Sequence, residues 1–299
     1  MAKTTTLRRW YFLSLVLGFA VVVLVRLFVL PEPTGESDRW VQVTSNVADN
    51  LIATILVAIA VGALVPFLFP SNDSSESIEL LDTKAIEDAI EEATKDAREW
   101  NVRARTANYF SRHTLPWLTK AALKGRRPVN IKMQLLDPEN EDLLRAYARM
   151  RSNPAKQWTV DRVRLEIYAS ILEAAICKQE APRINITVGL SSMNWVMSLD
   201  LSDEMALVTG QNKGEPGLLF SKASEFFTGW CDDFESAFAG CRHLIPEHPG
   251  ITRSGMRQPT DADIVGVRKF FSSLGLNTCA SDDELRKVIA QRGAPDNYA

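Results

Sequence analysis

The hydrophobic positions of this chain form two long runs near its start and shorter alternating segments further on. The runs cover Trp10–Leu30 and roughly Val47–Phe69, and the second has no charged residue between Leu51 and Phe69. A helix of about 20 apolar residues crosses the roughly 30 Å hydrocarbon core of a bilayer. The pattern therefore predicts a two-helix transmembrane hairpin over residues 1–70, with a short polar loop between the spans.

The first run could instead be a cleaved signal peptide, since Lys3, Arg8 and Arg9 precede it. A signal peptide has an apolar core of roughly 7–15 residues and a small-residue cleavage site, whereas this run is longer and ends at Pro31 without such a site. We expect a retained span. Because lysine and arginine favour the cytoplasmic side, we expect both termini in the cytoplasm. The predicted localisation is the cell inner membrane, multi-pass, with the lipid bilayer as a partner.

Three positions in the runs are candidates for assembly of the hairpins: Arg26, Ala58 and Gly62. A charge within a span is a functional candidate by default, for example as a pore-facing group. Arg26 lies near the end of its run, so its long side chain can also reach the interface, and we favour this interpretation. Ala58 and Gly62 form a small-xxx-small pair, which allows two helix backbones to approach closely.

Residues 71–100 are predicted to form an acidic connector helix. Residues 71–99 contain ten acidic and three basic side chains. From Ile78 to Trp100 apolar residues recur at alternating spacings of four and three, which is typical of one helix face. That face either packs on its own domain or joins protomers as a short coiled coil. Alanine at two of its positions would make the coiled coil a weak one.

From residue 101 onward strand and helix patterns alternate, which predicts an α/β domain over 101–245. The clearest strand lies between Pro128 and Pro138, where apolar residues take every second position. We expect further strands at 102–110, 183–190, 195–201 and 205–209, and helices at 114–124, 141–151, 160–178 and 221–241. Five aromatic residues of the last helix are expected to face the core: Phe226, Phe227, Trp230, Phe234 and Phe238.

Residues 246–299 are predicted to be a linker and a small helical tail. The stretch from Pro246 to Pro259 is rich in proline, glycine and polar residues, and two short amphipathic helices are expected at 262–274 and 281–292. Such a pair is either an appendage or a helix-turn-helix-like unit. Because the tail has no basic cluster for nucleic acid, we expect an appendage.

The cysteines and histidines indicate no metal site. Four cysteines form no Cys-x-x-Cys pair, and the three histidines have no ligand-like spacing. A reducing compartment explains the cysteines without disulfides, and a zinc site is not expected. We predict no metal and no cofactor.

The segment from Lys124 to Pro138 resembles the phospholipase D-like superfamily. A basic helix end, Lys-Gly-Arg-Arg, leads into a strand that ends at Asp-Pro, and a later run over 195–209 precedes a loop and a phenylalanine-rich helix. The resemblance covers about 100–242 and implies an α/β phospholipase D-like domain. Catalysis in that superfamily requires a His-x-Lys motif, but His113 is followed by Thr-Leu and His243 by Leu-Ile. No GxSxG, P-loop, HExxH or GxGxxG motif is present either, so we predict a non-catalytic domain and name no catalytic residue.

Basic side chains gather between residues 100 and 179, which contain fifteen basic and seven acidic residues. The candidates for a ligand-binding basic patch lie at the ends of the first strand, first helix and second strand: Arg103, Arg105, Arg112, Lys120, Lys124, Arg126 and Arg127. One interpretation is a solvated face that balances the acidic connector. The other is capture of a phosphate-bearing ligand, with Asp137 and Glu166 as carboxylates that orient it.

The layout of two apolar spans, a connector and a motif-free α/β domain is similar to the two-transmembrane effectors of bacterial antiphage systems. The similarity implies a homo-oligomeric membrane effector of an antiphage or stress defence system. Its cytosolic domain would sense a phosphate-bearing ligand or a protein partner, and the hairpins would assemble to perturb the inner membrane. The alternatives are a membrane-bound phospholipase-like enzyme acting on phosphodiester headgroups, and a membrane scaffold for a partner protein.

Overall fold

The computed structural model describes residues 78–125, 128–153, 157–210, 214–278 and 280–293, together with Leu24 and Thr54. From residue 78 onward the described residues belong to one compact unit. This unit holds the α/β domain and the C-terminal helices.

The transmembrane hairpin that opens the predicted fold class is wrong. Within the described ranges no helix is both long and apolar enough to cross a bilayer. This finding contradicts the predicted transmembrane hairpin and the multi-pass inner-membrane localisation. The apolar runs on which both predictions were based, with Arg26, Ala58 and Gly62, lie outside the described residues. The longest helix that the structure does describe has 21 residues, but charged side chains occur along it, so length alone does not make it a span.

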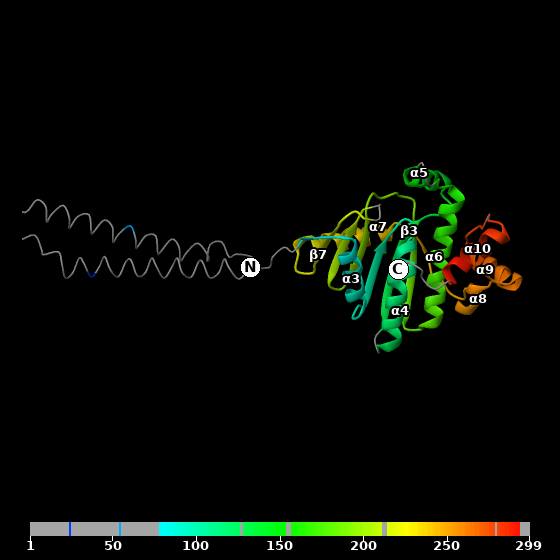
Figure 1. Ribbon diagram of the computed structural model, residues 1–299, viewed down its shortest axis with the longest axis horizontal. Helices are drawn as coiled ribbons and strands as arrows, with labels where there is room; N and C mark the ends of the chain where they lie inside the picture. The colour runs from blue at the N-terminus through cyan, green and yellow to red at the C-terminus, as the bar shows by residue number, and fades with distance from the viewer. Residues whose placement is uncertain are drawn as a thin grey trace, which may run out of the picture. The chain divides into compact units, whose positions relative to one another are not determined.

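An eight-stranded mixed sheet is the centre of the described fold, with the strand order β1-β7-β6-β5-β2-β3-β4-β8 (Figure 1). Strands β2, β3 and β4 are parallel, whereas all other neighbours in this sheet are antiparallel. The strands are β1 (Ile78–Leu81), β2 (Glu99–Arg103), β3 (Val129–Leu136), β4 (Ile184–Ser191), β5 (Ser198–Ser202), β6 (Met205–Thr209), β7 (Gly217–Ser221) and β8 (Arg242–Leu244).

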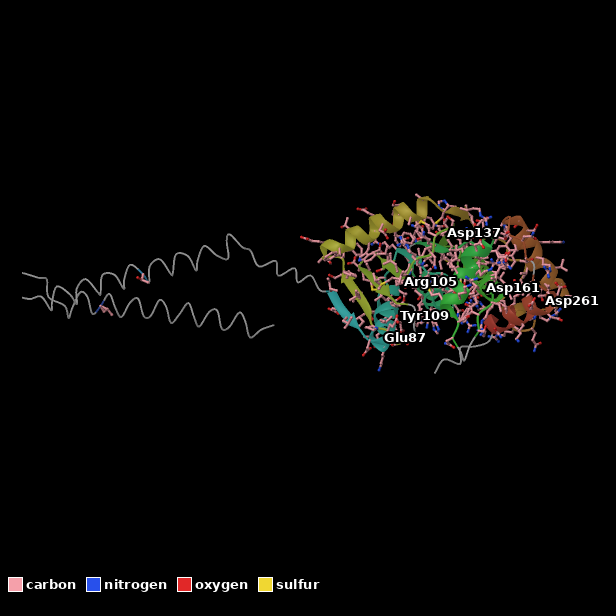
Figure 2. The ribbon with its side chains drawn as sticks, turned by 90° about the horizontal axis from the view of Figure 1, so that it is seen from above. Glu87, Arg105, Tyr109, Asp137, Asp161 and Asp261 are labelled. Atoms are coloured by element: carbon pink, nitrogen blue, oxygen red, sulfur yellow. The ribbon has the colours of Figure 1, made fainter. Side chains whose placement is uncertain are left out.

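Helices cover both faces of the sheet. One face carries the helices that connect the parallel strands, and α7 runs along the other face (Figures 1 and 2). The helices are α3 (Thr83–Thr94), the π-helical turn η1 (Phe110–Thr114), α4 (Leu115–Lys124), α5 (Glu141–Arg151), α6 (Val160–Glu180), α7 (Glu225–Ala239), α8 (Arg253–Arg257), α9 (Asp261–Ser273) and α10 (Asp282–Gly293).

The alternating pattern predicted most of these elements, and α5 and β6 have the predicted bounds. The helix predicted from Ile78 to Trp100 is wrong, because β1, α3 and the start of β2 divide this stretch. The side chain of Asp82 accepts a hydrogen bond from the backbone N–H of Ala85 at 2.8 Å, so the helix begins only after this cap. From Ile78 onward the predicted acidic connector is therefore an integral part of the sheet domain. Strands β7 and β8 were not predicted.

Helix α6 is enclosed on all sides. Nearly every residue from Val163 to Cys177 is buried, because the sheet lies on one side and the C-terminal helices pack on the other. On that second side the ring of Phe271 lies 4.9 Å from that of Tyr168, whose hydroxyl donates to the carbonyl of Asn277 at 2.9 Å. The tail therefore contributes to the main core, which explains why α6 lacks a clearly polar face.

Helix α7 covers the opposite face of the sheet only in part. Phe234 and Phe238 are buried against β5, β6 and β7, as predicted. Phe226, at the start of the helix, is 53 % exposed, so its predicted inward position is wrong. At its C-terminal end α7 lies close to β4 because Gly189 of that strand has no side chain. A Cβ atom added at Gly189 would lie 2.7 Å from the Phe238 ring.

Candidate functional site

Three parallel strands end side by side and define one edge of the sheet. Beyond β2, the carbonyl of Arg105 accepts from the backbone N–H of Leu136 at 3.0 Å, and beyond β3 the N–H of Asp137 donates to the carbonyl of Ser191 at 2.9 Å. Ligands of open α/β sheets bind outside the carboxyl ends of such strands. The side chains at the carboxyl ends of these strands are therefore the first candidates for a ligand-binding site.

Arg105 is buried, with 5 % of its surface exposed, and its side chain contacts the loop between β4 and β5. Its guanidinium group donates to the carbonyl of Trp195 at 2.6 and 3.0 Å and to the carbonyl of Val196. It also lies 5.9 Å from the centre of the Tyr147 ring. Burial lowers the pKa of Arg105 from its ordinary value. Arg105 thus fixes the loop that covers the edge.

Glu166, in the first half of α6, is the carboxylate of this region. Its Oε2 atom accepts from the hydroxyl of Thr106 at 3.4 Å, and its Oε1 atom lies 4.0 Å from Nε of Arg162. Burial raises the pKa of Glu166, although the charges of Arg292, Arg162 and Arg151 and the Thr106 hydrogen bond oppose this effect. The carboxylate therefore lies in a partly desolvated place with guanidinium groups around it.

The guanidinium groups gather from four separate parts of the chain. Arg162 and Arg151 lie 4.4 and 5.3 Å from the centre of the Trp158 ring. Arg292 of α10 donates to Ser111 at 2.5 Å and to Ser170 at 3.3 Å, which ties the last helix to η1 and α6. We call the following set the arginine cluster: Arg105, Arg151, Arg162, Arg292 and Glu166. Tyr147 and Trp158 border it, and burial raises the pKa of the Tyr147 hydroxyl.

The predicted basic patch is not one surface in the described structure. Arg105 lies in the arginine cluster, but Arg103 faces α7. It donates to Asp233 of α7 at 2.6 Å and to Gln134 of the neighbouring strand β3 at 2.8 Å. Lys120 and Lys124 are exposed on α4. The remaining three predicted residues are Arg112, which is half-buried on η1, and Arg126 and Arg127, which lie outside the described residues.

The two carboxylates proposed to orient a ligand are divided in the same way. Glu166 belongs to the arginine cluster, whereas Asp137 accepts from Arg242 at 3.1 Å and from the backbone N–H of Glu139 at 3.0 Å. Asp137 thus lies directly after β3, and its contact with Arg242 holds the edge strand β8.

The sequence reasoning missed most of the cluster. Arg162 and Glu166 are spaced as a helical i,i+4 pair, and Tyr147 and Arg151 have the same spacing on α5, so a search for such pairs could have found three of its residues and the bordering Tyr147. Arg292 could not be found this way, because only the packing of the C-terminal helices brings it to the edge.

The histidines do not form a catalytic pair. The ring of His113 stacks on Tyr109 at 4.7 Å on the side of α4, whereas His243 stacks on Phe238 of α7, on the opposite face. Between residues 78 and 293, where described, no group of three His, Cys, Asp or Glu side chains is placed to hold a metal ion.

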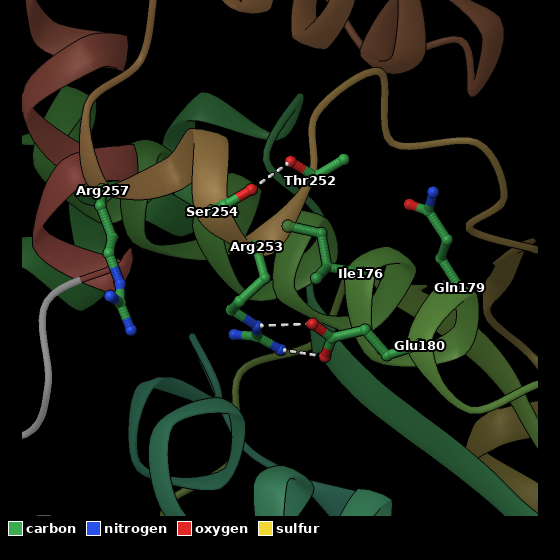
Figure 3. A pocket seen from close by; sticks show the side chains of 7 residues that line it. All are labelled: Ile176, Gln179, Glu180, Thr252, Arg253, Ser254 and Arg257. Carbon is green, nitrogen blue, oxygen red and sulfur yellow. Dashed lines mark hydrogen bonds and ion pairs between the residues drawn. The ribbon is translucent and has the colours of Figure 1, made fainter.

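A pocket of about 540 Å³ lies between the end of α6 and α8 (Figure 3). Its central cation is Arg253, which donates to Glu180 at 3.0 and 3.2 Å, to Glu173, and to the sulfur of Cys177 at 3.4 Å. Burial raises the pKa of Glu173, which its ion pair with Arg253 opposes. Because the donors of Arg253 are directed at α6, we interpret the contact as the attachment of the C-terminal helices.

Comparisons of this chain with protein-family models, with curated proteins and with solved structures find no match.

Proposed function

We propose that the sheet domain is a non-catalytic binding domain that senses a phosphate-bearing ligand at the arginine cluster. The supporting observation is the convergence of Arg151, Arg162 and Arg292 on Glu166, with Arg105 next to Arg151 above the carboxyl ends of β2–β4. Guanidinium groups match phosphate oxygens in geometry and charge, and they do so best where water is partly excluded. The strand ends are also where α/β sheets bind ligands.

Binding fits this cluster better than catalysis does. Guanidinium groups stay protonated and accept no proton, and Tyr147 keeps its proton because burial raises its pKa. Glu166 is the one carboxylate of the cluster as defined above. Such a set attracts and orients an anion, but it supplies no paired nucleophile and base. The expected role in a bacterial antiphage or stress defence system stays a prediction, as does the phospholipase-like alternative.

Titration calorimetry of the full-length protein with inorganic pyrophosphate and with a nucleoside triphosphate tests the proposal. Arg162 is the cluster residue to change, because its side chain is 42 % exposed and lies at the rim. A hydrogen bond to a charged group contributes about 1.5–3 kcal/mol, so Arg162→Gln is expected to weaken binding about tenfold or more. Added salt should weaken binding by the parent protein.

Arg145→Gln is the matched control. Arg145 is 48 % exposed on the neighbouring helix α5 and pairs with Glu141 and Asp142 of its own helix. Its loss removes the same charge at a similar exposure, yet it leaves the cluster intact. Failure of both probes to bind, or an equal loss in the two variants, would refute the proposal.

A further inference from the structure

Strand β1 lies at one end of the sheet. Among the described strands it pairs only with β7, and the paired residues run from Ile78 opposite Phe220 to Leu81 opposite Gly217. An edge strand presents a row of backbone N–H and C=O groups on its outer side, which is a template for another strand. The four residues of β1 therefore offer a short site for strand addition.

The apolar face of the sheet continues onto β1 beyond the part that α7 covers. Residues directly opposite in an antiparallel pair share a face, so Ile78 and Leu80 lie on the same face as Phe220 and Leu218. The Phe220 ring is covered by Trp230 of α7, with ring centres 5.8 Å apart. One strand further out, Leu80 is 69 % and Ile78 43 % exposed.

We infer that β1 pairs with β1 of a second copy of this chain. A two-fold axis perpendicular to the sheet makes the two edge strands antiparallel and keeps the apolar faces of both sheets on the same side. The partner then supplies a strand and an apolar neighbour for Leu80 at once. This is self-complementary, since the same strand provides both halves of the contact.

The side chains of β1 select one register. With Leu80 opposite Leu80 of the second copy, two exposed leucines meet at the axis, and each Glu79 lies opposite Leu81 of the other copy. The alternative register, with Glu79 opposite Glu79, places like charges directly across from each other, which is destabilising. Because β1 has only four residues, the dimer is expected to depend on concentration.

Cysteine cross-linking in the full-length protein tests this register. Directly opposite Cα atoms in an antiparallel pair are about 4.5–5.5 Å apart, within the range of about 4.4–6.8 Å that a disulfide spans. Residues two positions away are about 7–8 Å apart. Under mild oxidation with diamide, Leu80→Cys is therefore expected to give a disulfide-linked dimer, and Glu79→Cys is not.

The parent protein, with its native cysteines, sets the background for cross-linking. A Leu80→Cys dimer well above that background and above Glu79→Cys supports the proposal. No excess at position 80, or a stronger cross-link at position 79, would overturn it.

A charge substitution provides a second readout that needs no disulfide. Leu80→Lys places two like charges at the axis and is expected to lower the dimer fraction measured by light scattering at least severalfold. Met193→Lys is the control, because Met193 is 70 % exposed, almost the same as Leu80, and lies on the β4–β5 loop. Equal dimer fractions in the two variants would contradict pairing through β1.

Discussion

Asp200 is a carboxyl group that the fold keeps away from water at the centre of the sheet. It lies on β5, with only 9 % of its surface exposed, and its Oδ1 atom accepts from the indole N–H of Trp100 at 3.2 Å. Burial raises its pKa from 3.8 to about 6, and the single hydrogen bond from Trp100 opposes this shift only in part. Ionised Asp200 therefore destabilises the folded protein.

The sign and size of the effect follow from linkage between protonation and folding. Because the folded pKa is the higher one, the stabilisation by protonated Asp200 is complete below pH 3.8 and is lost as the pH rises through about 6. The shift of roughly two pKa units corresponds to about 3 kcal/mol. Asp200→Asn keeps an oxygen for Trp100 and never ionises. It is expected to stabilise the protein by up to about 3 kcal/mol at pH 8, with the gain vanishing near pH 4.

Urea unfolding of the full-length protein, followed by tryptophan fluorescence between pH 4 and pH 8, measures this difference. The control is Asp88→Asn on α3, where the side chain is exposed and the substitution removes the same charge. A destabilised Asp200→Asn variant at pH 8 would refute the reasoning. A gain that is independent of pH, or shared by the control, would refute it as well.

Three further substitutions test contacts that depend on backbone geometry, each through the urea midpoint. Gly250→Ala is expected to cost more than about 2 kcal/mol, since Gly250 has φ +71° and its Cβ atom would lie 2.6 Å from the backbone of Gly266; a neutral effect would contradict this contact. Gly189→Ala should cost about 1–3 kcal/mol, because the added methyl group meets the Phe238 ring at 2.7 Å, and unchanged stability would mean that α7 shifts freely. Thr260→Ala removes a capping box at the start of α9 and should cost about 1 kcal/mol, with faster hydrogen exchange in the first turn of that helix; unchanged exchange would show that the cap contributes nothing.

The sequence pattern predicted the elements whose periodicity reflects a single buried face. Apolar and polar residues alternate along β3 because its two faces differ. Ile131 and Met133 face the helices that connect the parallel strands, whereas Lys132 on the other face donates to Glu235 of α7 at 2.7 Å. The pattern failed mainly where an element is short. Three- and five-residue strands such as β8 and β7 contain too few positions to show a period.

The prediction of the site failed for a different reason. Charge density along the chain drew attention to residues 103–127, but the side chains there point in different directions. Arg103 and Arg105 are only two residues apart, yet one meets Asp233 on α7 and the other lies under the β4–β5 loop. Clusters of charge in a fold are set by strand ends and helix packing, and both bring together residues that are distant in sequence.

Helix α6 connects the proposed ligand site to the C-terminal helices. Glu166 in its first half contributes to the arginine cluster, and Glu173 in its second half holds Arg253 of α8. Arg292 of α10 reaches the same helix at Ser170, next to the cluster. The C-terminal helices therefore bury the outer side of α6 and also supply one of the four guanidinium groups. Because Arg292 acts on Glu166 and packs on α6, the proposal predicts that ligand binding at the cluster and packing of α8–α10 on α6 favour each other.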